Sequence, residues 1–502
     1  MSESTSHHGI DVVTTGVEGL DDVLGGGLQR RRLYLVEGVP GSGKTTLALQ
    51  FLLAAARRGE PVLYITLSET LDELNSVAAS HGWTLEGITV RETILTEGVL
   101  DPDAQATMFH PSEIELAHTT RAILADIDRT KPTCVVIDSM SELRMLSGSP
   151  LRHRRQVLGL KQYFASRGCI VLLLDDMTVT ESDAQVQSIV HGVLRLEQLN
   201  PEYGTDRRRL RVVKYRATAF RGGYHDYTIT RGGLEVFPRL VAAEHRQLLG
   251  REKLPSGIPA FDQLLGGGLE QGTSTLIVGA AGTGKSTLAA QFAAAAASRG
   301  QRASFFIFDE TPATLLTRAG ELNIPLAEGV DKGLIEIRPV DPAELSPGEL
   351  VHAVRTAVER DGASLIVIDS LNGYLNAMPG ERFLIIQLHE LLTYLAQRNV
   401  ATIMVSAHQG LVGAQMIATV DATYLADAVV LMRFFEARGR IRQAVSVVKK
   451  RGGDHERTIR EFGFERGSIW VGAALDQFRG VLTGVPVYEG PLERPGTTDD
   501  GQ

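Results

Sequence analysis

Short apolar runs recur along the first half of the chain, separated by longer stretches with the periodicity of amphipathic helices. Three such runs are Arg32–Gly38 (RLYLVEG), Thr133–Ser139 (TCVVIDS) and Cys169–Asp176 (CIVLLLDD). Unbroken apolar runs of this length are typical of strands that are buried on both faces of a parallel sheet. Because helical sequence separates them, the pattern predicts a strand–helix–strand–helix order and a doubly wound α/β core.

A different pattern follows at 192–238, where apolar and polar residues alternate over short runs joined by glycine-rich turns. The runs are GVLRLEQL (192–199), RRLRVVKYR (208–216) and YHDYTITRGGLEVFP (224–238). Alternation with a period of two is typical of strands that have one solvated face. We therefore expect all three runs to form antiparallel strands at the edge of a mostly parallel sheet.

The first apolar run leads into GVPGSGKT, Gly38–Thr45, which fits the phosphate-binding loop pattern G-x-x-x-x-G-K-[ST]. Helical sequence follows at Thr45–Arg58, so the loop ends at a helix N-terminus, where free backbone N–H groups favour an anion. In this motif the lysine reaches the β- and γ-phosphates, and the last hydroxyl binds Mg²⁺. The residues that we expect to surround the phosphates are Gly41, Ser42, Gly43, Lys44, Thr45 and Thr46.

A second loop, GAAGTGKS at Gly279–Ser286, has the same strand before it and the same helix after it. Lys285 lies 241 positions after Lys44, and the segment LGGGL recurs with the same spacing at 24–28 and 265–269. This constant spacing indicates an internal duplication. The second set of phosphate-binding residues is Gly282, Thr283, Gly284, Lys285, Ser286 and Thr287.

Length and composition fit two globular domains. The chain has 502 residues, of which 43% are apolar and 22% are charged, as in ordinary folded proteins. We expect a disordered N-terminus at 1–9, one phosphate-loop domain at 10–243, a second at 244–487 and a disordered tail at 488–502. The polar stretch around 237–255 is the predicted hinge between the domains.

The remaining composition narrows the class of protein. A net charge of −9 argues against a surface that coats nucleic acid. No apolar run approaches the about 18 residues needed to span a bilayer, and 1–8 lack the apolar segment of a secretory signal. Cys134 and Cys169 each begin an apolar run, which favours buried reduced thiols over a disulfide or a metal pair. These features predict a cytoplasmic protein.

Each half also has an apolar strand that ends in Asp-Ser, with Asp138 in VVIDS and Asp369 in IVIDS. In phosphate-loop proteins an acid at this place holds Mg²⁺ together with the loop hydroxyl. We therefore expect Asp138 to act with Thr45 and Asp369 with Ser286. The alternative is that each aspartate caps the following helix, but its recurrence at corresponding places favours the metal role.

Transfer of a phosphoryl group also needs a carboxylate that orients or deprotonates the attacking oxygen. The strand after each loop helix ends in such residues, Ser68-Glu69 in the first half and Asp309-Glu310 in the second. The expected catalytic groups are therefore Glu69, Asp309 and Glu310, together with Lys44 and Lys285. Ser68 and Asp309 are also suited to be helix N-caps.

A pair of basic residues follows in each half, Lys214 with Arg216 and Lys449 with Arg451. Residues two apart on a strand point the same way. Each pair could therefore reach a phosphate that is bound by a neighbouring subunit. The alternative is a solvated edge strand whose lysine prevents aggregation.

Together, the tandem loops, the LGGGL segments, the IDS strands and the basic pairs resemble the KaiC family of clock ATPases and autokinases, a branch of the RecA-like superfamily. KKRGGDHERTIREF, 449–462, is also close to the family's second-domain sequence. The resemblance covers about residues 10–485. It implies a homohexamer of two stacked rings with ATP between subunits. Four residues match the family's trans-acting residues: Lys214, Arg216, Lys449 and Arg451.

The sequence also departs from the family pattern. After the second strand the family has two adjacent glutamates, of which the first is the general base. In this chain the first glutamate is replaced by Ser68 in the first half and by Asp309 in the second. Thr423 and Tyr424 fall where the family has adjacent Ser-Thr phospho-acceptors, so only Thr423 offers an aliphatic hydroxyl. The tail has no similarity to the family's activator-binding segment.

The leading hypothesis is an ATP-hydrolysing protein with Ser/Thr autokinase activity in its second domain, where Asp309 is the base and Thr423 the acceptor. An alternative is a nucleotide-switched hexameric platform for a KaiB-like or signalling partner, with little kinase activity. A RecA-type motor that processes DNA fits less well, because the chain is acidic.

Overall fold

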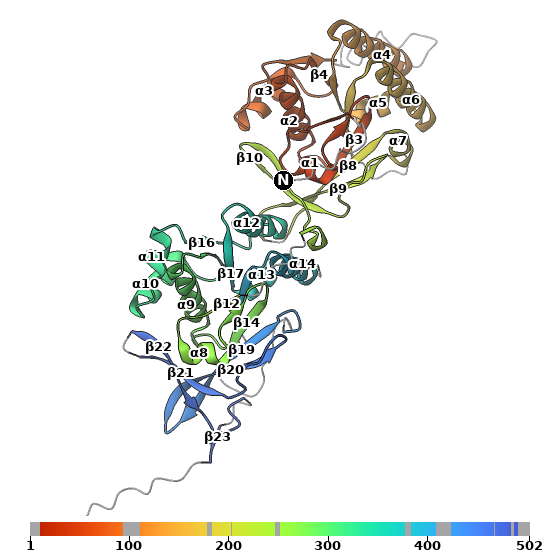
Figure 1. Ribbon diagram of the computed structural model, residues 1–502. Helices are drawn as coiled ribbons and strands as arrows, with labels where there is room; N and C mark the ends of the chain where they lie inside the picture. The colour runs from red at the N-terminus through yellow and green to blue at the C-terminus, as the bar shows by residue number, and fades with distance from the viewer. Residues whose placement is uncertain are drawn as a thin grey trace, which may run out of the picture. The chain divides into compact units, whose positions relative to one another are not determined.

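The computed structural model divides the chain into two compact units, with the boundary between Arg239 and Leu240. Each unit is an α/β fold in which helices flank a central sheet (Figure 1). None of the helices in the described part of the chain is both long and apolar enough to cross a membrane. The described residues are 11–93, 111–177, 183–201, 203–245, 252–376, 383–407, 423–465, 467–482 and 486–489.

The first unit is built on a nine-stranded sheet in the order β5-β4-β6-β7-β3-β8-β9-β10-β11. The six strands from β5 to β8 run parallel, and β9, β10 and β11 continue the sheet in antiparallel pairs. This confirms the predicted α/β class. The strands are β3 (Leu33–Gly38), β4 (Val62–Thr66), β5 (Ile88–Glu92), β6 (Cys134–Asp138), β7 (Ile170–Asp176), β8 (Gly192–Leu199), β9 (Arg207–Tyr215), β10 (His225–Thr230) and β11 (Gly233–Phe237).

The prediction for 192–199 was wrong in one respect. This segment is β8, and it pairs in parallel with β3, inside the sheet. Helix α7 (Asp183–Ile189) lies between β7 and β8 in the chain, and a helical crossover of this kind returns the next strand in the parallel direction. The alternating pattern reflects the partial exposure of β8 beyond Leu194, which sequence alone did not distinguish from an edge.

Helices cover both faces of this sheet (Figure 1). One buried cluster joins α2 (Lys44–Arg57) and α3 (Leu71–Ser80) to one face, with α1 (Leu20–Leu24) beside them. A second cluster joins α4 (Pro111–Thr130), α5 (Met140–Ser147) and α6 (Pro150–Arg167) to the other face. Cys134 and Cys169 are buried, one in each cluster, and neither forms a disulfide.

The second unit repeats this arrangement strand for strand, in the order β16-β15-β17-β18-β14-β19-β20-β21-β22. Its parallel strands run from β16 to β19, and β20 to β22 are antiparallel. The strands are β14 (Ser274–Gly279), β15 (Arg302–Ile307), β16 (Ile335–Pro339), β17 (Ala363–Asp369), β18 (Ala401–Ala407), β19 (Ala428–Ala437), β20 (Arg440–Lys450), β21 (Arg460–Glu465) and β22 (Ser468–Ala474).

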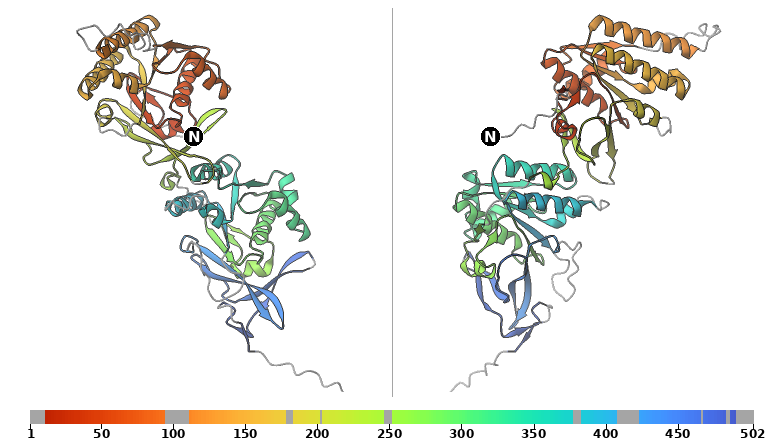
Figure 2. Two further views of the ribbon diagram at one scale, coloured as in Figure 1. Left: turned by 180° about the vertical axis from the view of Figure 1, so that it is seen from behind. Right: turned by 45° about the vertical axis from the view of Figure 1, so that its right-hand side comes forward.

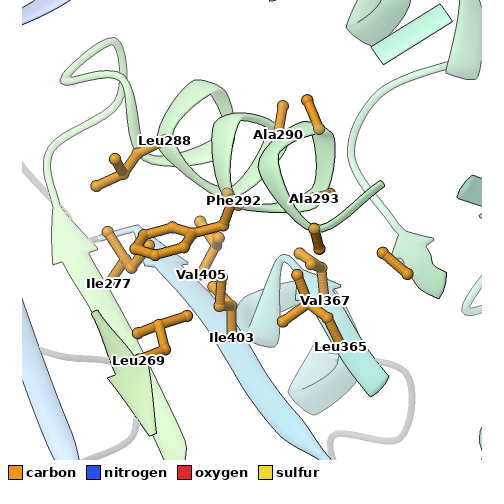
Figure 3. Close-up of a cluster of buried hydrophobic side chains, with 14 of the residues drawn as sticks. Leu269, Ile277, Leu288, Ala290, Phe292, Ala293, Leu365, Val367, Ile403 and Val405 are labelled. Atoms are coloured by element: carbon orange, nitrogen blue, oxygen red, sulfur yellow. The ribbon is translucent and has the colours of Figure 1, made fainter. Parts of the chain in front are cut away.

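Helices α9 (Lys285–Ser298), α10 (Pro312–Glu321) and α11 (Leu326–Asp331) lie on one face of the second sheet. Helices α12 (Pro347–Glu359), α13 (Leu371–Asn376) and α14 (Leu384–Gln397) lie on the other, as the two further views show (Figure 2). In Figure 3, Phe292 of α9 points between strands β14 and β18, towards Ile277 and Val405. This packing fixes the loop helix against the strands that carry the candidate site.

The two LGGGL segments have a structural reason. Each leads into a two-residue strand, β2 (Leu28–Gln29) and β13 (Leu269–Glu270), which pairs with β1 (Val12–Val13) and β12 (Lys253–Leu254) respectively. A Cβ on Gly27 would lie 2.3 Å from the carbonyl oxygen of Val13, and one on Gly268 would lie 2.6 Å from that of Leu254. Only glycine permits this approach.

The predicted disordered N-terminus, the middle of the predicted hinge and most of the predicted tail lie outside the described residues. At the start of that tail, Tyr488 pairs with Phe478 in the small hairpin of β23 (Phe478–Arg479) and β24 (Val487–Tyr488).

Candidate functional site

Each phosphate loop joins the end of a central strand to the start of a buried helix. The loop glycines adopt the left-handed conformation, with φ of 80° at Gly41 and 89° at Gly43, and 81° at Gly282 and 91° at Gly284. A Cβ on Gly43 would lie 2.5 Å from the Ile229 side chain, and one on Gly284 would lie 2.3 Å from the Phe464 ring. Conformation and space together therefore require glycine at these positions.

The loop helices begin without a side-chain cap. Helices α3 and α10 are capped by Thr70 and Thr311, whose hydroxyls accept hydrogen bonds from backbone N–H groups. In contrast, α2 and α9 have glycine as their N-cap residue and no acidic residue in their first turn. Their first N–H groups and the positive end of the helix dipole are thus left for an anion.

The loop lysines are buried and turned back into their loops. Lys44 Nζ donates hydrogen bonds to the carbonyl oxygens of Gly38 (2.9 Å) and Val39 (3.1 Å), and it pairs with Asp176 Oδ1 at 2.8 Å. Lys285 Nζ donates to the Ala280 carbonyl at 2.8 Å. Burial lowers the pKa of Lys285. Each loop therefore holds one ammonium group against its own backbone carbonyl oxygens.

The predicted hydroxyl–carboxylate pair forms in the first unit. Thr45 Oγ1 donates to Asp138 Oδ2 at 3.2 Å, and the Tyr64 hydroxyl donates to the same oxygen at 2.6 Å. Burial raises the pKa of Asp138, although these two hydrogen bonds and Lys44 oppose the rise. The capping alternative for this aspartate is wrong, because Ser139 is the N-cap residue of α5.

The second unit holds its aspartate differently. Phe305 stands 241 positions after Tyr64 and offers no hydroxyl. Asp369 Oδ2 is buried and has no hydrogen-bond partner in the described part of the chain. Burial raises the pKa of Asp369 to about 6, despite the Ser286 hydroxyl beside it.

A buried carboxylate beside a loop hydroxyl is suited to Mg²⁺, which prefers oxygen ligands. The orphaned Asp369 oxygen fits such an ion. Among the described residues, no three His, Cys, Asp or Glu side chains gather as a metal site. An ion here would therefore complete its shell with phosphate oxygens and water, as Mg²⁺ commonly does.

The acids after β4 and β15 also differ between the units. Ser68 is exposed, while Glu69 is half-buried and its Oε2 has no partner among the described residues. Burial, Asp138, Glu73 and Asp176 all raise the pKa of Glu69. In the second unit, Ser370 Oγ donates to Asp309 Oδ2 at 2.5 Å. Neither Ser68 nor Asp309 caps a helix, since Thr70 and Thr311 do so; that expectation was wrong.

The basic pairs lie at the opposite end of the sheet from the loop of their own unit. Lys214 pairs with Val193, which pairs with Leu35, three residues before Gly38. Three residues of a strand span about 10 Å. Lys449 has the same register through Val429 and Leu276. The structure therefore does not bring either pair to the phosphate loop of its own unit.

Instead, each pair binds backbone carbonyl groups that lie just before the preceding strand of the sheet, β8 in the first unit and β19 in the second. Lys214 Nζ donates to the carbonyl oxygens of Gln187 (2.6 Å) and Val190 (2.8 Å), and Arg216 donates to that of Ser188 (2.8 Å). Burial lowers the pKa of Lys214 to about 8, with Arg216 and Lys161 adding to the effect.

In the second unit the same contacts involve Thr423, the predicted phospho-acceptor, and its neighbour Tyr424. Lys449 Nζ donates to the Thr423 carbonyl at 2.7 Å, and Arg451 donates to the Tyr424 carbonyl at 2.5 Å. Tyr424 is exposed and Thr423 is partly buried. The basic pair thus holds the backbone at Thr423 and Tyr424.

Sequence reasoning missed three residues that shape these sites. Asp176 pairs with Lys44, Tyr64 donates to Asp138, and Arg318 lines the cavity of about 240 Å³ over the second loop. A comparison of the halves at their spacing of 241 would have marked two of them, because Tyr64 aligns with Phe305 and Arg318 with Val77.

Two mostly parallel sheets, each with an uncapped loop helix, a buried loop lysine and a buried aspartate near the loop hydroxyl, define a tandem RecA-like phosphate-loop NTPase. A family model described as "ATPase: KaiC" matches residues 13–241 and again 254–475. The chain therefore belongs to the KaiC family of ATPases. This membership confirms the resemblance drawn from the sequence and supports both ATP binding and ATPase activity.

Curated relatives match along nearly the whole chain. A circadian clock oscillator protein KaiC of Picosynechococcus is 26% identical over 498 residues, which cover 97% of this chain and 95% of the relative. The protein of the same name from Prochlorococcus marinus is 27% identical over 496 residues, covering 96% and 97%. Another, from Parathermosynechococcus lividus, is 27% identical over 494 residues, covering 95% and 88%.

Proposed function

We propose that this protein hydrolyses ATP with Mg²⁺ at both phosphate loops. One observation carries the proposal: in each unit a buried loop lysine, an uncapped helix start and a buried strand-end aspartate meet at one end of the sheet. The lysines, Lys44 and Lys285, would bind the β- and γ-phosphates. Thr45 with Asp138, and Ser286 with Asp369, would hold the ion, which neutralises charge on the phosphates.

In hydrolysis the oxygen of the attacking water bonds to the γ-phosphorus, and the bond between that phosphorus and the β-phosphate oxygen breaks. A carboxylate is needed to accept the proton that the water loses. In the first unit we assign this role to Glu69, whose Oε2 has no hydrogen-bond partner among the described residues. In the second unit we assign it to Asp309, which Ser370 orients. A raised pKa suits Glu69 to accept a proton.

We also propose that Lys214, Arg216, Lys449 and Arg451 contact ATP held by an adjacent copy of the chain in a homohexamer. Their register supports this role, because neither pair can approach its own loop without leaving its strand. We also propose that the protein is cytoplasmic.

In the second unit we propose autokinase activity that transfers the γ-phosphoryl group to Thr423. The contact between Lys449 and the Thr423 carbonyl supports it, because it ties the acceptor segment to a residue of the proposed nucleotide site. The second candidate is a nucleotide-switched platform for a signalling or KaiB-like partner. The replacement of the family's first glutamate by Ser68 favours slow turnover and so supports this candidate.

Steady-state ATP hydrolysis by Lys44→Ala, Lys285→Ala and double-variant proteins tests the proposal. We expect each single variant to lose the contribution of its own unit and the double variant to fall about 100-fold or more. Lys332→Ala is the control, since Lys332 is an exposed lysine in a surface ion pair. A double variant as active as this control would refute the assignment. Phosphopeptide mapping after the same incubations tests the kinase, which unmodified Thr423 would exclude.

A further inference from the structure

The second of the two acidic residues after β15, Glu310, forms an ion pair. Arg318 of α10 donates to both carboxylate oxygens of Glu310, at 2.7 and 2.8 Å. The pair is partly shielded from water, with side-chain exposures of 35% for Arg318 and 18% for Glu310. A bidentate guanidinium–carboxylate contact of this kind is strong and fixes the orientation of both groups.

The first unit has no counterpart to this arginine. Val77 stands 241 positions before Arg318 and packs against the apolar cluster between α3 and the sheet. The corresponding acid, Glu69, therefore keeps its buried Oε2 without a hydrogen-bond partner in the described part of the chain. The difference between Val77 and Arg318 thus decides whether the glutamate is paired, as Glu310 is, or unpaired, as Glu69 is.

We propose that Arg318 is a positioning residue that withholds Glu310 from the reaction, so that the reacting carboxylate is Asp309 in the second unit and Glu69 in the first. The inference rests on the proposed function, hydrolysis of ATP at both loops. The guanidinium occupies one lone-pair site on each oxygen of Glu310 and fixes its orientation, so Glu310 can turn towards an attacking water and take its proton only by giving up part of that contact.

The surroundings of the pair agree with this role. Arg318 lines the cavity over the second loop together with Lys285 and Ser286, so the pair lies beside the place expected for the phosphates. Its neighbour Asp309 accepts from Ser370, which directly follows the strand-end Asp369. The second unit therefore orients Asp309 towards the end of β17 and pairs Glu310 with α10.

The two units allow the test to run in both directions. Carried out with Lys44→Ala, which leaves only the second unit active, Asp309→Asn should lower kcat about 100-fold. Adding Arg318→Val to Asp309→Asn frees Glu310 and should restore at least about tenfold of that loss. Adding Arg318→Lys should restore less, because lysine still pairs with Glu310 as a single cation.

The reciprocal change is Val77→Arg with Lys285→Ala, which leaves only the first unit active. The new arginine should pair with Glu69 and lower kcat about tenfold or more, while the Kd for a fluorescent ATP analogue at the first loop stays within about twofold. Val77→Leu is the matched control for bulk at this site. Retained binding of the analogue shows that the variant is folded.

Three results would overturn the inference while hydrolysis itself persists. They are full activity of Asp309→Asn, no recovery when Arg318→Val is added to it, and Val77→Arg as active as Val77→Leu. If neither single-unit background hydrolyses ATP, the proposed function fails first and this inference falls with it.

Discussion

The first and second units have the same strand order and the same loop geometry, yet they hold their acidic side chains differently. In the first, Asp138 Oδ2 accepts from two hydroxyls, whereas Asp369 Oδ2 has no partner among the described residues. Glu69 has a free oxygen where Glu310 is tied to Arg318. The backbone of the two phosphate loops is thus the constant part of the duplication, and the side chains that hold the nearby acidic groups are the variable part.

This division has a physical basis. The phosphate cradle consists of backbone N–H groups and glycines in a left-handed conformation, which tolerate little change. An acid near the cradle can be oriented by any neighbouring donor that reaches it, from the next strand or from the next helix. The units differ at three further positions, and each difference allows a test of its effect on stability or on the binding of ATP.

The largest effect is expected at the tyrosine that donates to Asp138. Tyr64→Phe should lower the free energy of unfolding of the first unit by about 2 kcal/mol, because it removes a hydrogen bond to a buried carboxylate. Hydrogen exchange of peptides from β4 and β6 measures this loss. The reverse change, Phe305→Tyr, should stabilise the second unit by supplying a donor to Asp369, and Phe306→Tyr is its control on the opposite face of β15.

An unchanged first unit in Tyr64→Phe would show that the short contact contributes nothing to stability. Equal effects of the two substitutions in β15 would show that Asp369 does not use the new hydroxyl.

A smaller effect is expected at Glu60, which Gln301 replaces in the second unit. Burial alone would raise the pKa of Glu60, but hydrogen bonds from Arg30, Arg58 and Thr133 outweigh it and lower the pKa to about 2. Because the folded-state pKa lies below the ordinary 4.5, the stabilisation is complete above that pH and is lost as the pH falls towards 2.

Glu60→Gln should therefore cost the first unit about 1 kcal/mol at pH 7 and remove this part of its acid sensitivity. Unit-resolved unfolding between pH 7 and pH 3 measures both, with Glu328→Gln as a control at an exposed surface pair. An acid response of the first unit that survives Glu60→Gln unchanged would place its origin elsewhere.

The smallest effect is expected at Asp176, which pairs with Lys44. If Lys44 binds ATP as proposed, this carboxylate would compete with a phosphate for the ammonium group. Ala407 occupies the corresponding register position in the second unit. Because Asp176 is 38% exposed and such pairs are worth under about 1 kcal/mol, Asp176→Ala should tighten ATP binding at the first loop by up to about fivefold. Titration with Lys285→Ala present measures it, and Ala407→Asp should weaken the second loop. Weaker binding in Asp176→Ala would mean that the carboxylate helps to hold the ligand.

Much of the fold could be predicted from the sequence because it depends on local patterns. Buried parallel strands are continuous apolar runs, and each loop has a strand before it and a helix after it. The direction of β8 could not be predicted, because it depends on the crossover through α7 and not on the residues of the strand itself.

The candidate site could be predicted only where the backbone defines it. Which hydroxyl caps a helix depends on the path of the chain as it enters that helix, so Thr70 and Thr311 were missed as caps in favour of Ser68 and Asp309. The Glu310–Arg318 pair depends on how the side chain of Glu310, which precedes α10, turns towards Arg318 on that helix. The spacing of the repeat nevertheless marks Val77 and Arg318 as different, which is where such a search would begin.

The register of Lys214 and Lys449 has a consequence for how activity would scale. In the proposed arrangement, the phosphate loop and the basic pair of each unit lie at opposite ends of the sheet. A single chain therefore cannot bring both to the same ATP molecule. Dilution would then remove catalysis without unfolding anything, and mass action between copies would be as much a regulator of this enzyme as any small molecule.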